Sequence, residues 1–514
     1  MIKEQYNDDS LNIALDTINR NKQAIIFANT KNSAEKTAEE ISKKLKTTEE
    51  FEKISEKALK SLSSPTKQCR RLAECLKKGI AFHHAGLTAK QKDLIEDNFR
   101  EKKIKIIAAT PTLAMGVDLP ASRVILKDLR RYGYRGLQYI PVLEYMQMAG
   151  RAGRPKFDNK GEAIIISQSD SHKDELTERY IEGFPEPIFS KLAVEPVLRT
   201  YVLSLISAGF VNSKKDIFNF FEKTFWAHQF QDIEKLHSKI EGMLNLLEEW
   251  EFLMSSDDSD FKSASDMLNE KYKSTILGKR VAELYIDPLT AHYLHEMLKK
   301  ASKKGLTAFS TLHILSSTLE IRPQIKARVK DYEKVQDILL KFGDELLDKE
   351  PSIYEPEYED FQNSVRTAMF FNDWIKEDNE EVLLEEYKVR PGEIRVKLDI
   401  ADWLIYCMEE ITRIIQFKTL MPELKKIRIR VKNGVREELI PLLKFKGIGR
   451  VRARKLFKNS IKDIKNVKET DLMKLSQILG KAIALDIKKQ VGQEFKEIKE
   501  GKRKGQLSLQ KYGK

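Results

Sequence analysis

Short apolar runs alternate with segments of helical spacing over the first third of the chain. Between the first two runs, residues 31–45 repeat apolar side chains at helical spacing. Strands that are apolar on both faces and alternate with helices are typical of a parallel sheet. The pattern therefore predicts one parallel α/β domain that ends near Phe184. Its strands are expected at 23–29, 80–86, 104–110, 123–128 and 162–167.

From residue 185 the apolar spacing becomes helical for most of the remaining chain. It predicts helices at 196–210, 214–229 and 231–250, with a turn at 211–213. Three such helices, followed by a short segment to about residue 272, fit a winged-helix module. Further helices are expected over 275–425, where a Pro-Gly pair at 391–392 precedes a long amphipathic segment.

A glycine turn follows, between two helical stretches. Gly447 and Gly449 flank an isoleucine, and a basic segment with Arg450, Arg452 and Arg454 comes directly after. This order is typical of a helix-hairpin-helix, in which glycines let backbone N–H groups approach a DNA phosphate. An ordinary corner between two helices stays open as the alternative. The basic residues favour phosphate binding.

Charge is concentrated in the same region. The 514 residues carry a net charge of +13, and 41% of them are apolar, as expected for a folded protein of several domains. Residues 423–465 hold 15 Lys and Arg against 4 Asp and Glu, whereas 351–386 is acidic. A local basic block predicts a polyanionic partner. The alternative is the solvated surface of a lysine-rich protein.

Several classes are disfavoured by what the sequence lacks. No apolar run is long enough for a membrane span, and the amino terminus has no signal-peptide pattern, so a cytoplasmic protein without membrane partners is expected. Cys69, Cys75 and Cys407 are too few for a disulfide framework and lack the spacing of a zinc site. We expect reduced thiols packed in or near cores, and no bound metal.

Three loops that follow strands or precede them carry distinctive sequences. They are "HHAGL" at 83–87, "ATPTLAMGVDLPA" at 109–121 and "QMAGRAGRP" at 147–155. Ligands of parallel α/β domains bind at the carboxyl ends of the strands. These loops resemble motifs IV-a, V and VI of superfamily 2 helicases, with "IIFANT" at 25–30 as motif IV. The block 24–167 is therefore similar to the second of two RecA-like motor domains.

The resemblance extends along nearly the whole chain. The segments "GVDLPASRVILKD", "YIPVLEYMQMAGRAGRP", "LRTYVLSLISAGF", "LGKRVAELYIDPLTA" and "GIGRVRARKLF" are similar to the archaeal fork-restart DNA helicases related to HELQ and to the helicase domain of polymerase theta. That resemblance implies a multidomain α/β plus α protein. Its parts would be a second RecA-like motor domain (1–184), a winged helix (185–272), a helical ratchet domain (273–425), a helix-hairpin-helix domain (426–490) and a basic flexible tail (491–514).

The resemblance implies a nucleotide surface on motifs V and VI. Arg151 and Arg154 would reach a nucleotide held by the first motor domain and neutralise charge on the γ-phosphoryl group as it is transferred. Gln147 would couple the nucleotide to the loops, and Gly116 and Asp118 would lie near the γ-phosphate and ribose. A structural salt bridge is the alternative role for the two arginines.

The resemblance also implies DNA contacts along the chain. Asn29, Thr30, His84, Gly86 and Thr110 would hold backbone phosphates of the tracking strand, although such histidines are more often ordinary loop residues. A hairpin at 129–141 would separate the duplex. Its Tyr132 and Tyr134 would stack on the last base pair or, alternatively, form a buried aromatic core. In the ratchet helix, Trp403 would stack on a base or lie in the core, with Arg395 as a less secure polar contact.

The sequence contains no P-loop and no acidic strand end for Mg²⁺, both of which a helicase motor needs. ATP and Mg²⁺ would therefore be held mainly by a first motor domain on a separate polypeptide, and this chain alone is expected to be inactive. A split enzyme and a shortened gene both explain the pattern, and motif VI favours the first. The alternatives are a non-catalytic DNA-binding scaffold and a fragment of an RNA helicase. The predicted helix-hairpin-helix favours DNA over RNA.

The last residues suggest one more partner. Gln506, Leu509 and Tyr512 have the spacing of a weak sliding-clamp-binding peptide, although Gly513 stands where a second aromatic residue is expected.

Overall fold

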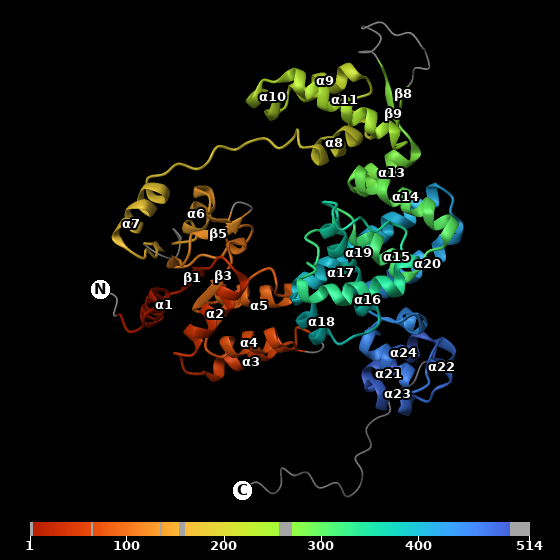
Figure 1. Ribbon diagram of the computed structural model, residues 1–514. Coiled ribbons are helices and arrows are strands. Elements are labelled where there is room, and N and C mark those ends of the chain that lie inside the picture. The colour runs from red at the N-terminus through yellow and green to blue at the C-terminus, as the bar shows by residue number, and fades with distance from the viewer. Residues whose placement is uncertain (1–3, 63–64, 134–135, 154–159, 256–269, 494–514) are drawn as a thin grey trace, which may run out of the picture. The chain divides into compact units, whose positions relative to one another are not determined.

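The computed structural model describes residues 4–62, 65–133, 136–153, 160–255 and 270–493. The chain divides into two compact units, and Figure 1 shows the helices and strands in chain order by colour. The first comprises Met1–Leu289 together with Asn379–Ile400, and the second comprises Thr290–Asp378 together with Ala401–Lys514. Residues 379–400, which the sequence placed in a ratchet domain, thus belong with the motor domain in the first unit.

A five-stranded parallel sheet forms the centre of the motor domain, in the order β2-β3-β1-β4-β7. The predicted parallel sheet is therefore confirmed, with each strand inside its expected range. The carboxyl-terminal residues of β1–β4 are in register, because Phe27 pairs with Ala109 and Leu126, and His83 pairs with Ala109. The loops after these strands therefore emerge at one edge. The strands are β1 (Ala24–Phe27), β2 (Ile80–His83), β3 (Ile106–Ala109), β4 (Arg123–Leu126) and β7 (Glu162–Ile165).

Helices enclose this sheet, and polar caps fix where several of them begin. Thr30 accepts a hydrogen bond from the backbone of Ser33 at the start of α2, and Thr88 and Gln91 form a capping box at α5. The helices are α1 (Asp9–Asn19), α2 (Lys31–Ser42), α3 (Glu52–Leu59), α4 (Lys67–Leu76), α5 (Ala89–Arg100), α6 (Val142–Ala149) and α7 (Asp170–Leu176).

A separate antiparallel hairpin interrupts the motor domain between β4 and α6. It consists of β5 (Arg130–Gly133) and β6 (Gly136–Tyr139), with Arg130 paired to Tyr139 and Tyr132 paired to Leu137. The predicted hairpin is confirmed.

Helices and one short antiparallel pair make up the described residues between 195 and 284. The sequence predicted one helix over 214–229, but the structure has two. Thr224 is extended (φ −80°, ψ 159°), and its side chain accepts a hydrogen bond from the backbone of Ala227, so a new helix begins there. The elements are α8 (Glu195–Ser207), α9 (Lys214–Glu222), α10 (Phe225–Phe230), α11 (Ile233–Glu249), β8 (Leu253–Ser255), β9 (Tyr272–Ser274) and α13 (Ile276–Leu284).

The second unit is helical. Nearly all of α17 is buried, including Arg366, which pairs with Asp331 at 3.1 Å. The helices here are α14 (Pro288–Lys304), α15 (Ala308–Ser316), α16 (Tyr332–Phe342), α17 (Tyr358–Ile375) and α20 (Met421–Asn433). Two further helices, α18 (Glu380–Tyr387) and the start of α19 (Pro391–Ile414), fall in the first unit.

The carboxyl-terminal part has a hydrophobic core of its own, which includes Leu439, Leu456 and Leu475. Besides the predicted glycine turn, a second helix–glycine–helix corner stands at Gly480 (φ 89°). The elements are a 3-10 helix, η7 (Glu437–Lys444), then α21 (Arg450–Lys458), α22 (Ile464–Glu469), α23 (Leu472–Leu479) and α24 (Lys481–Gln490).

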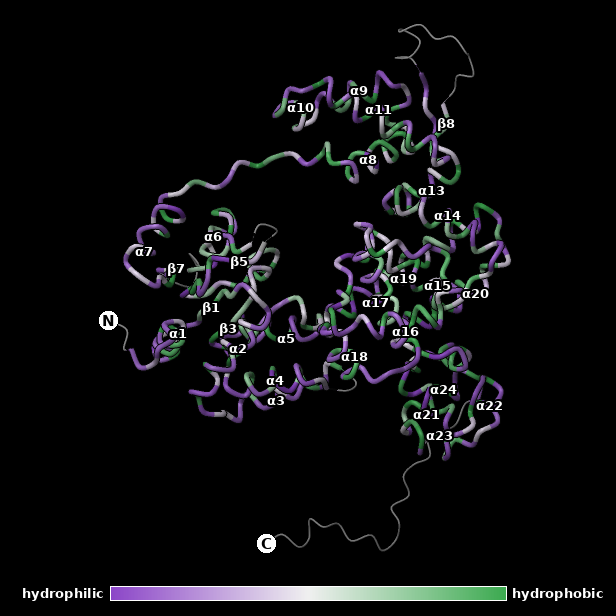
Figure 2. The backbone as a smooth tube through the Cα atoms, in the orientation of Figure 1, coloured by the Kyte–Doolittle hydropathy of each residue, from purple (hydrophilic) through white to green (hydrophobic). Residues whose placement is uncertain are grey.

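None of the described helices is both long and apolar enough to cross a membrane, and Figure 2 shows hydrophilic residues interrupting the hydrophobic ones along α17 and α20. Within the described ranges, no three His, Cys, Asp or Glu side chains are grouped so that they could hold a metal ion. Cys69, Cys75 and Cys407 are buried free thiols, and burial raises the pKa of Cys75 to about 12.

Candidate functional site

A pocket of about 650 Å³ lies at the carboxyl edge of the sheet. Three of the residues predicted to hold DNA phosphates, Asn29, Thr30 and Thr110, line it together. They follow β1 and β3, whose ends are in register, and this register brings them to one place. The other lining residues are Lys31, Asn32, Ala85, Pro111, Thr112, Met115, Arg131, Glu144 and Arg390.

The polar groups of this pocket are mostly neutral hydrogen bonders. The Thr110 hydroxyl lies 3.0 Å from the Thr112 hydroxyl, and Asn29 donates its amide hydrogen to the carbonyl of Arg130. Thr30 is exposed at the amino terminus of α2, where the helix dipole favours an anion. Such groups can accept or donate hydrogen bonds to a phosphate of any sequence.

His84 and Gly86 require a correction. The His84 side chain has no exposed surface, its Nε2 lies 3.0 Å from Glu35, and its Nδ1 accepts a hydrogen bond from the Gly86 backbone. The Gly86 carbonyl in turn accepts a hydrogen bond from the backbone of Gly392. Both residues hold the loop in place rather than presenting groups to a phosphate. The neighbouring His83 is also buried, and its pKa is lowered to about 4 by burial and by Lys92 and His84.

Arg151 links motif VI to motif V. Its guanidinium donates to the carbonyl of Ala114, with Nε at 3.2 Å, and Nη1 lies 3.9 Å from Asp118. The Asp118 side chain is 88% exposed, so its pairing with Arg151 is weak. The salt bridge to Asp118 alone therefore does not account for Arg151, and its role at a nucleotide stays a prediction. The backbone carbonyl fixes the guanidinium on one side.

The other predicted nucleotide residues lie on the same two segments. Gln147 and Gly116 are exposed, and Gly116 has a left-handed backbone (φ 82°) that suits glycine. Exposed apolar side chains stand beside them at Met115, Leu143 and Met146. Arg154 lies outside the described residues.

The hairpin presents Tyr132 to solvent, with 85% of its side chain exposed. The alternative of a buried aromatic core is thus wrong for Tyr132. The base of the hairpin is fixed by Arg130, which stacks on the Tyr139 ring at 4.4 Å, and by Arg131, which donates to Glu144 at 2.8 Å. Tyr134 lies outside the described residues.

The two candidate residues of α19 differ in exposure. Arg395 is exposed, whereas Trp403 is half-buried beside the fully buried Leu404. The same helix carries Lys397. It is half-buried, and its pKa is lowered by burial.

The arginines after the glycine turn differ in their contacts within the protein. Arg454 pairs with both oxygens of Glu377 at 2.6 Å and with Glu438 at 2.9 Å, so its charge is already neutralised, and these partners raise its pKa. Arg450 stacks on Trp374 at 5.0 Å and donates to the carbonyl of Asp378. Arg454 is corrected to a structural residue, and Arg450 is partly engaged within the protein.

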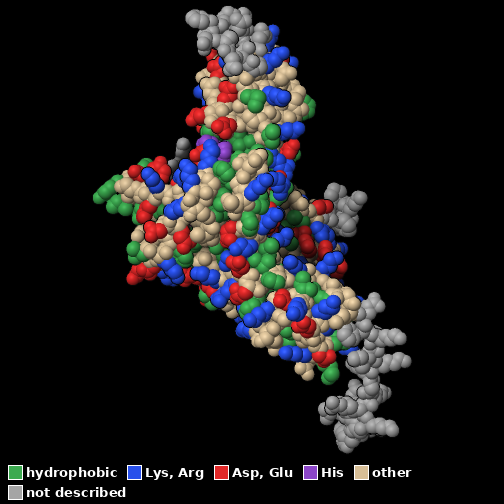
Figure 3. All heavy atoms as spheres, turned by 90° about the vertical axis from the view of Figure 1, so that its right-hand side faces the viewer, with side chains coloured by type: hydrophobic (Ala, Val, Ile, Leu, Met, Phe, Trp, Pro, Cys, Tyr) green, Lys and Arg blue, Asp and Glu red, His purple; other side chains and the backbone are tan. Residues whose placement is uncertain are grey.

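Exposed groups remain at the turn itself. Gly447 (φ 80°) and Gly449 are exposed, and Arg452, also exposed, donates to the Gly447 carbonyl at 2.6 Å. On the face displayed in Figure 3, blue Lys and Arg side chains are interspersed with red Asp and Glu. Within residues 423–465 the excess of basic residues is partly paired, because Lys426 lies 2.6 Å from Glu423 and Arg428 lies 3.0 Å from Asp402.

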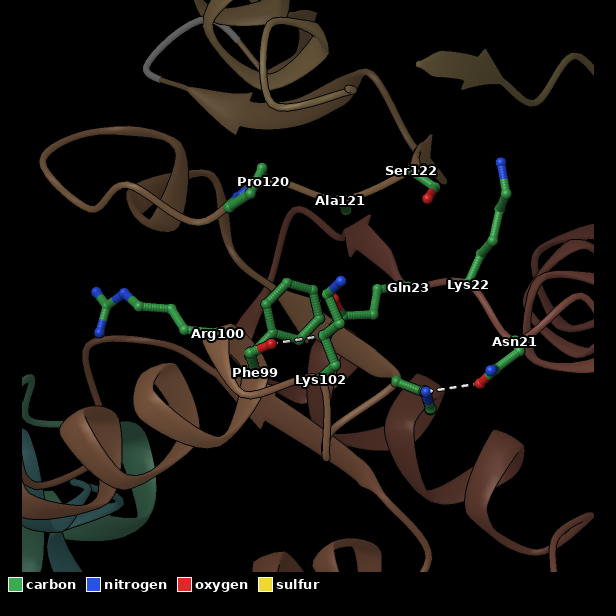
Figure 4. Close-up of a pocket in the computed structure, with 10 residues that line it drawn as sticks. Asn21, Lys22, Gln23, Phe99, Arg100, Lys102, Pro120, Ala121 and Ser122 are labelled. Atoms are coloured by element: carbon green, nitrogen blue, oxygen red, sulfur yellow. Dashed lines mark hydrogen bonds between the residues drawn. The ribbon is translucent and has the colours of Figure 1, made fainter. Parts of the chain in front are cut away.

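A second pocket lies at the opposite, amino-terminal edge of the sheet (Figure 4). Lys22, Arg100, Lys102 and Lys105 line it. Arg100 is paired with Asp97 at 2.9 Å, and Lys105 donates to Asn21 at 2.8 Å. We assign no ligand to this pocket, because two of its four cations, Arg100 and Lys105, are engaged with protein groups.

Sequence reasoning missed Lys31, Arg131 and Arg390 as pocket residues. Lys31 and Arg131 stand next to residues that were singled out, and their charge was the available signal. Arg390 is more than 350 residues from Asn32 and Glu35, to which it is bonded, and nothing in the local pattern indicates that contact.

Comparison with known proteins agrees with these motifs. The family "Helicase conserved C-terminal domain" matches residues 8–156, and the family "Archaeal helicase, domain 4" matches residues 309–434. The ATP-dependent DNA helicase Hel308 of Pyrococcus horikoshii is 37% identical over 504 residues, which are 96% of this chain and 67% of the relative. Hel308 of Pyrococcus abyssi is 37% identical over 98% of this chain and 68% of its own length.

A third relative, Hel308 of Methanocella arvoryzae, is 36% identical over 95% of this chain and 65% of its own length. The chain thus spans about two thirds of the length of these relatives. Because relatives 37% identical are matched over about two thirds of their own length, and two helicase families also match, the chain belongs to the Hel308 family of archaeal DNA helicases.

Proposed function

We propose that the chain is the DNA-tracking half of an ATP-dependent 3′-to-5′ helicase that acts on forked or single-stranded DNA in replication-fork repair. In this proposal it supplies Arg151 to a nucleotide bound by a P-loop motor domain that these 514 residues do not contain. The observation that carries the proposal is the link from Arg151 to the motif V loop. The same loop region begins with Thr110, which lines the candidate DNA pocket.

The residues present fit one half of a nucleotide site. Arg151 would act on the γ-phosphoryl group, and the exposed Gly116, Asp118 and Gln147 would line the same surface. The phosphate cradle and the Mg²⁺ ligands would come from the other motor domain, since this sequence has neither. Bound ATP supplies the phosphoryl transfer whose energy drives movement.

Arg151 contributes by orientation and charge. The carbonyl of Ala114 holds its Nε and so limits the directions in which the remaining N–H groups can point. A guanidinium that is already oriented can stabilise the charge that develops on a phosphoryl group, because it does not have to reorient during the transfer. A shift of motif VI would be passed to motif V through this bond, and from there to the DNA pocket.

The pocket would hold a backbone phosphate of the tracking strand. Asn29, Thr30 and Thr110 supply neutral groups, and Lys31 and Arg131 supply positive charge nearby. Neutral hydrogen bonds grip any sequence and release readily, which suits stepwise movement. Exposed Tyr132 on the hairpin would stack on the last base pair, and Trp403 and Arg395 of α19 would contact the strand beyond.

We also propose the domain roles that the resemblance implies. Residues 185–272 would act as a winged helix, 273–425 as the ratchet domain and 426–490 as a helix-hairpin-helix domain that binds DNA through Gly447, Gly449 and Arg452. The sliding-clamp peptide at Gln506, Leu509 and Tyr512 lies outside the described residues and stays a prediction.

The test is complementation. The 514-residue chain is mixed with a purified P-loop motor domain from the same genome, and ATP hydrolysis is measured with and without single-stranded DNA. We expect each part alone to be inactive and the mixture to show DNA-stimulated hydrolysis and 3′-to-5′ unwinding. Tight DNA binding by the chain without hydrolysis in any mixture would support the scaffold instead. Unwinding of RNA but not DNA would support an RNA helicase.

A further inference from the structure

A buried carboxylate ties the start of α19 to the motor domain. The Glu35 side chain, in α2, is only 4% exposed and lies 3.0 Å from His84 Nε2 and 3.1 Å from Arg390 Nε. Arg71 of α4 bonds its second oxygen. One carboxylate thus joins α2, α4, the loop after β2 and the residue directly before α19. All of these residues lie in the first compact unit.

The backbones also meet at this place, without room for side chains. The Gly392 N–H donates to the Gly86 carbonyl at 3.0 Å. A Cβ on Gly392 would lie 2.5 Å from the carbonyl oxygens of Ala85 and Leu87, and a Cβ on Gly86 would lie 2.3 Å from Arg390 Cδ. Neither glycine has a positive φ, so close packing rather than backbone conformation explains them.

The first turn of α19 has two further attachments. Glu393 accepts a hydrogen bond from the Arg390 backbone at 2.8 Å and pairs with Lys31, the first residue of α2. Arg390 also donates to Asn32. Both ends of this contact are thereby fixed, because the loop 84–87 is held by His84 and the helix start is held by Arg390.

The carboxylate at the centre keeps its charge. Burial would raise the pKa of Glu35, but the hydrogen bond from His84 and the charges of Arg390 and Arg71 outweigh burial and lower the pKa to about 2. The Glu35 carboxylate is therefore ionised at any pH well above 2.

We propose that Glu35, Gly86, Arg390 and Gly392 form a rigid joint that makes the start of α19, residues 391–400, move with the motor domain. An α-helix transmits displacement along its axis, so a movement of the loop 84–87 would carry Arg395 with it. Arg390 is in this view a positioning residue that couples nucleotide-driven movement to the helix that holds DNA. The proposal rests on the proposed helicase function.

Two variants test the joint. Arg390→Ala removes the bonds to Glu35 and Asn32. Its matched control, Arg70→Ala, removes an exposed ion pair between α4 and α18, to Glu381 at 3.3 Å. Amide hydrogen exchange is measured on the 514-residue chain without nucleotide or DNA. In Arg390→Ala we expect exchange to rise about tenfold in residues 84–87 and 391–398 together, and in neither segment of the control.

The second readout is coupling in the complemented enzyme. Arg390→Ala should lower the base pairs unwound per ATP hydrolysed several-fold, while the KM for ATP stays within about twofold. Arg390→Lys, which keeps one charged bond to Glu35, should restore part of the coupling.

Each other outcome overturns the proposal in its own way. Exchange that rises in only one segment, or in neither, excludes a joint whether or not the mixture is active. If amide exchange rises in both segments but the number of base pairs unwound per ATP does not change, the contact is structural and does not couple the two movements. A DNA affinity weakened tenfold with unchanged coupling makes Arg390 a phosphate ligand instead. If no mixture hydrolyses ATP, the helicase function and the coupling role both fail, while the exchange result still decides the contact.

Discussion

Replacement of Gly434 by alanine should destabilise the second unit for two separable reasons. Gly434 ends α20 in the left-handed conformation (φ 63°, ψ 53°), and its N–H donates to the carbonyl of Arg430. A Cβ at this position would lie 2.6 Å from Cε2 and 2.7 Å from Cζ2 of Trp374. The ring cannot move aside freely, because it is buried and its Nε1 donates to the carbonyl of Val431 at 2.7 Å.

The expected loss combines backbone strain and overpacking. A left-handed conformation costs an alanine about 1 kcal/mol, and an added methyl group in a packed core costs about 1–3 kcal/mol. Gly434→Ala should therefore lower the free energy of unfolding by about 2–4 kcal/mol. Gly305→Ala is the matched control. Gly305 follows the last residue of α14 with φ 93°, and a Cβ added there would meet no described atom within 4 Å.

Urea unfolding measures the difference. In a background with Trp226 and Trp250 replaced by phenylalanine, tryptophan fluorescence reports only the second unit. We expect Gly434→Ala to lose about 1–3 kcal/mol more than Gly305→Ala, since only the first carries the packing cost. Equal losses in the two variants would refute the argument, because they would show that the Trp374 ring yields without cost.

Four further variants test the chemistry of other places. Because the pKa of Glu35 is lowered to about 2, its ionised carboxylate stabilises the folded state by about 3 kcal/mol; this stabilisation is complete above the ordinary pKa near 4.5 and is lost as pH falls toward 2. Hydrogen exchange in the joint should rise over that pH window, and Glu35→Gln should abolish the pH dependence. Arg454→Ala should lower the Tm, measured by calorimetry, with little effect on DNA affinity, whereas Arg452→Ala should weaken DNA binding, measured by titration, without lowering the Tm. Weaker DNA binding with an unchanged Tm in Arg454→Ala would contradict its assignment as a structural residue. Tyr132→Ala should slow duplex unwinding through the loss of about 1–3 kcal/mol of stacking but leave ATP hydrolysis stimulated by single strands unchanged, and a loss of both activities would speak against a role at the fork.

The sheet and part of the site could be predicted because their signals are local. Apolar runs mark β1–β4, and the parallel order places Asn29, Thr30 and Thr110 at one edge. The break between α9 and α10 was missed, although Thr224 is a common capping residue. A single polar residue within a helical pattern is a weaker signal than the apolar spacing around it.

Long-range partners explain the remaining errors. The sequence around His84 resembles a DNA-contacting loop, but its side chain is buried and lies against Glu35, which is 49 residues away. Arg454 stands in a basic helix, but its partner Glu377 is 77 residues away. No local pattern shows whether a charged side chain is already paired. The joint at Arg390 was missed because its partners are also distant in the sequence. The contact between Arg151 and a backbone carbonyl could not be predicted, because every residue has such a carbonyl.

The central claim is that Arg151 acts on a nucleotide held by another motor domain. Single-turnover ATP hydrolysis by the complemented enzyme tests it most directly, with Arg151→Ala compared with Arg100→Ala as a control for loss of one surface charge. We predict that Arg151→Ala lowers the rate by about a thousandfold or more while nucleotide affinity stays within about threefold. A rate within about threefold of the unaltered chain, in an active mixture, would contradict the claim.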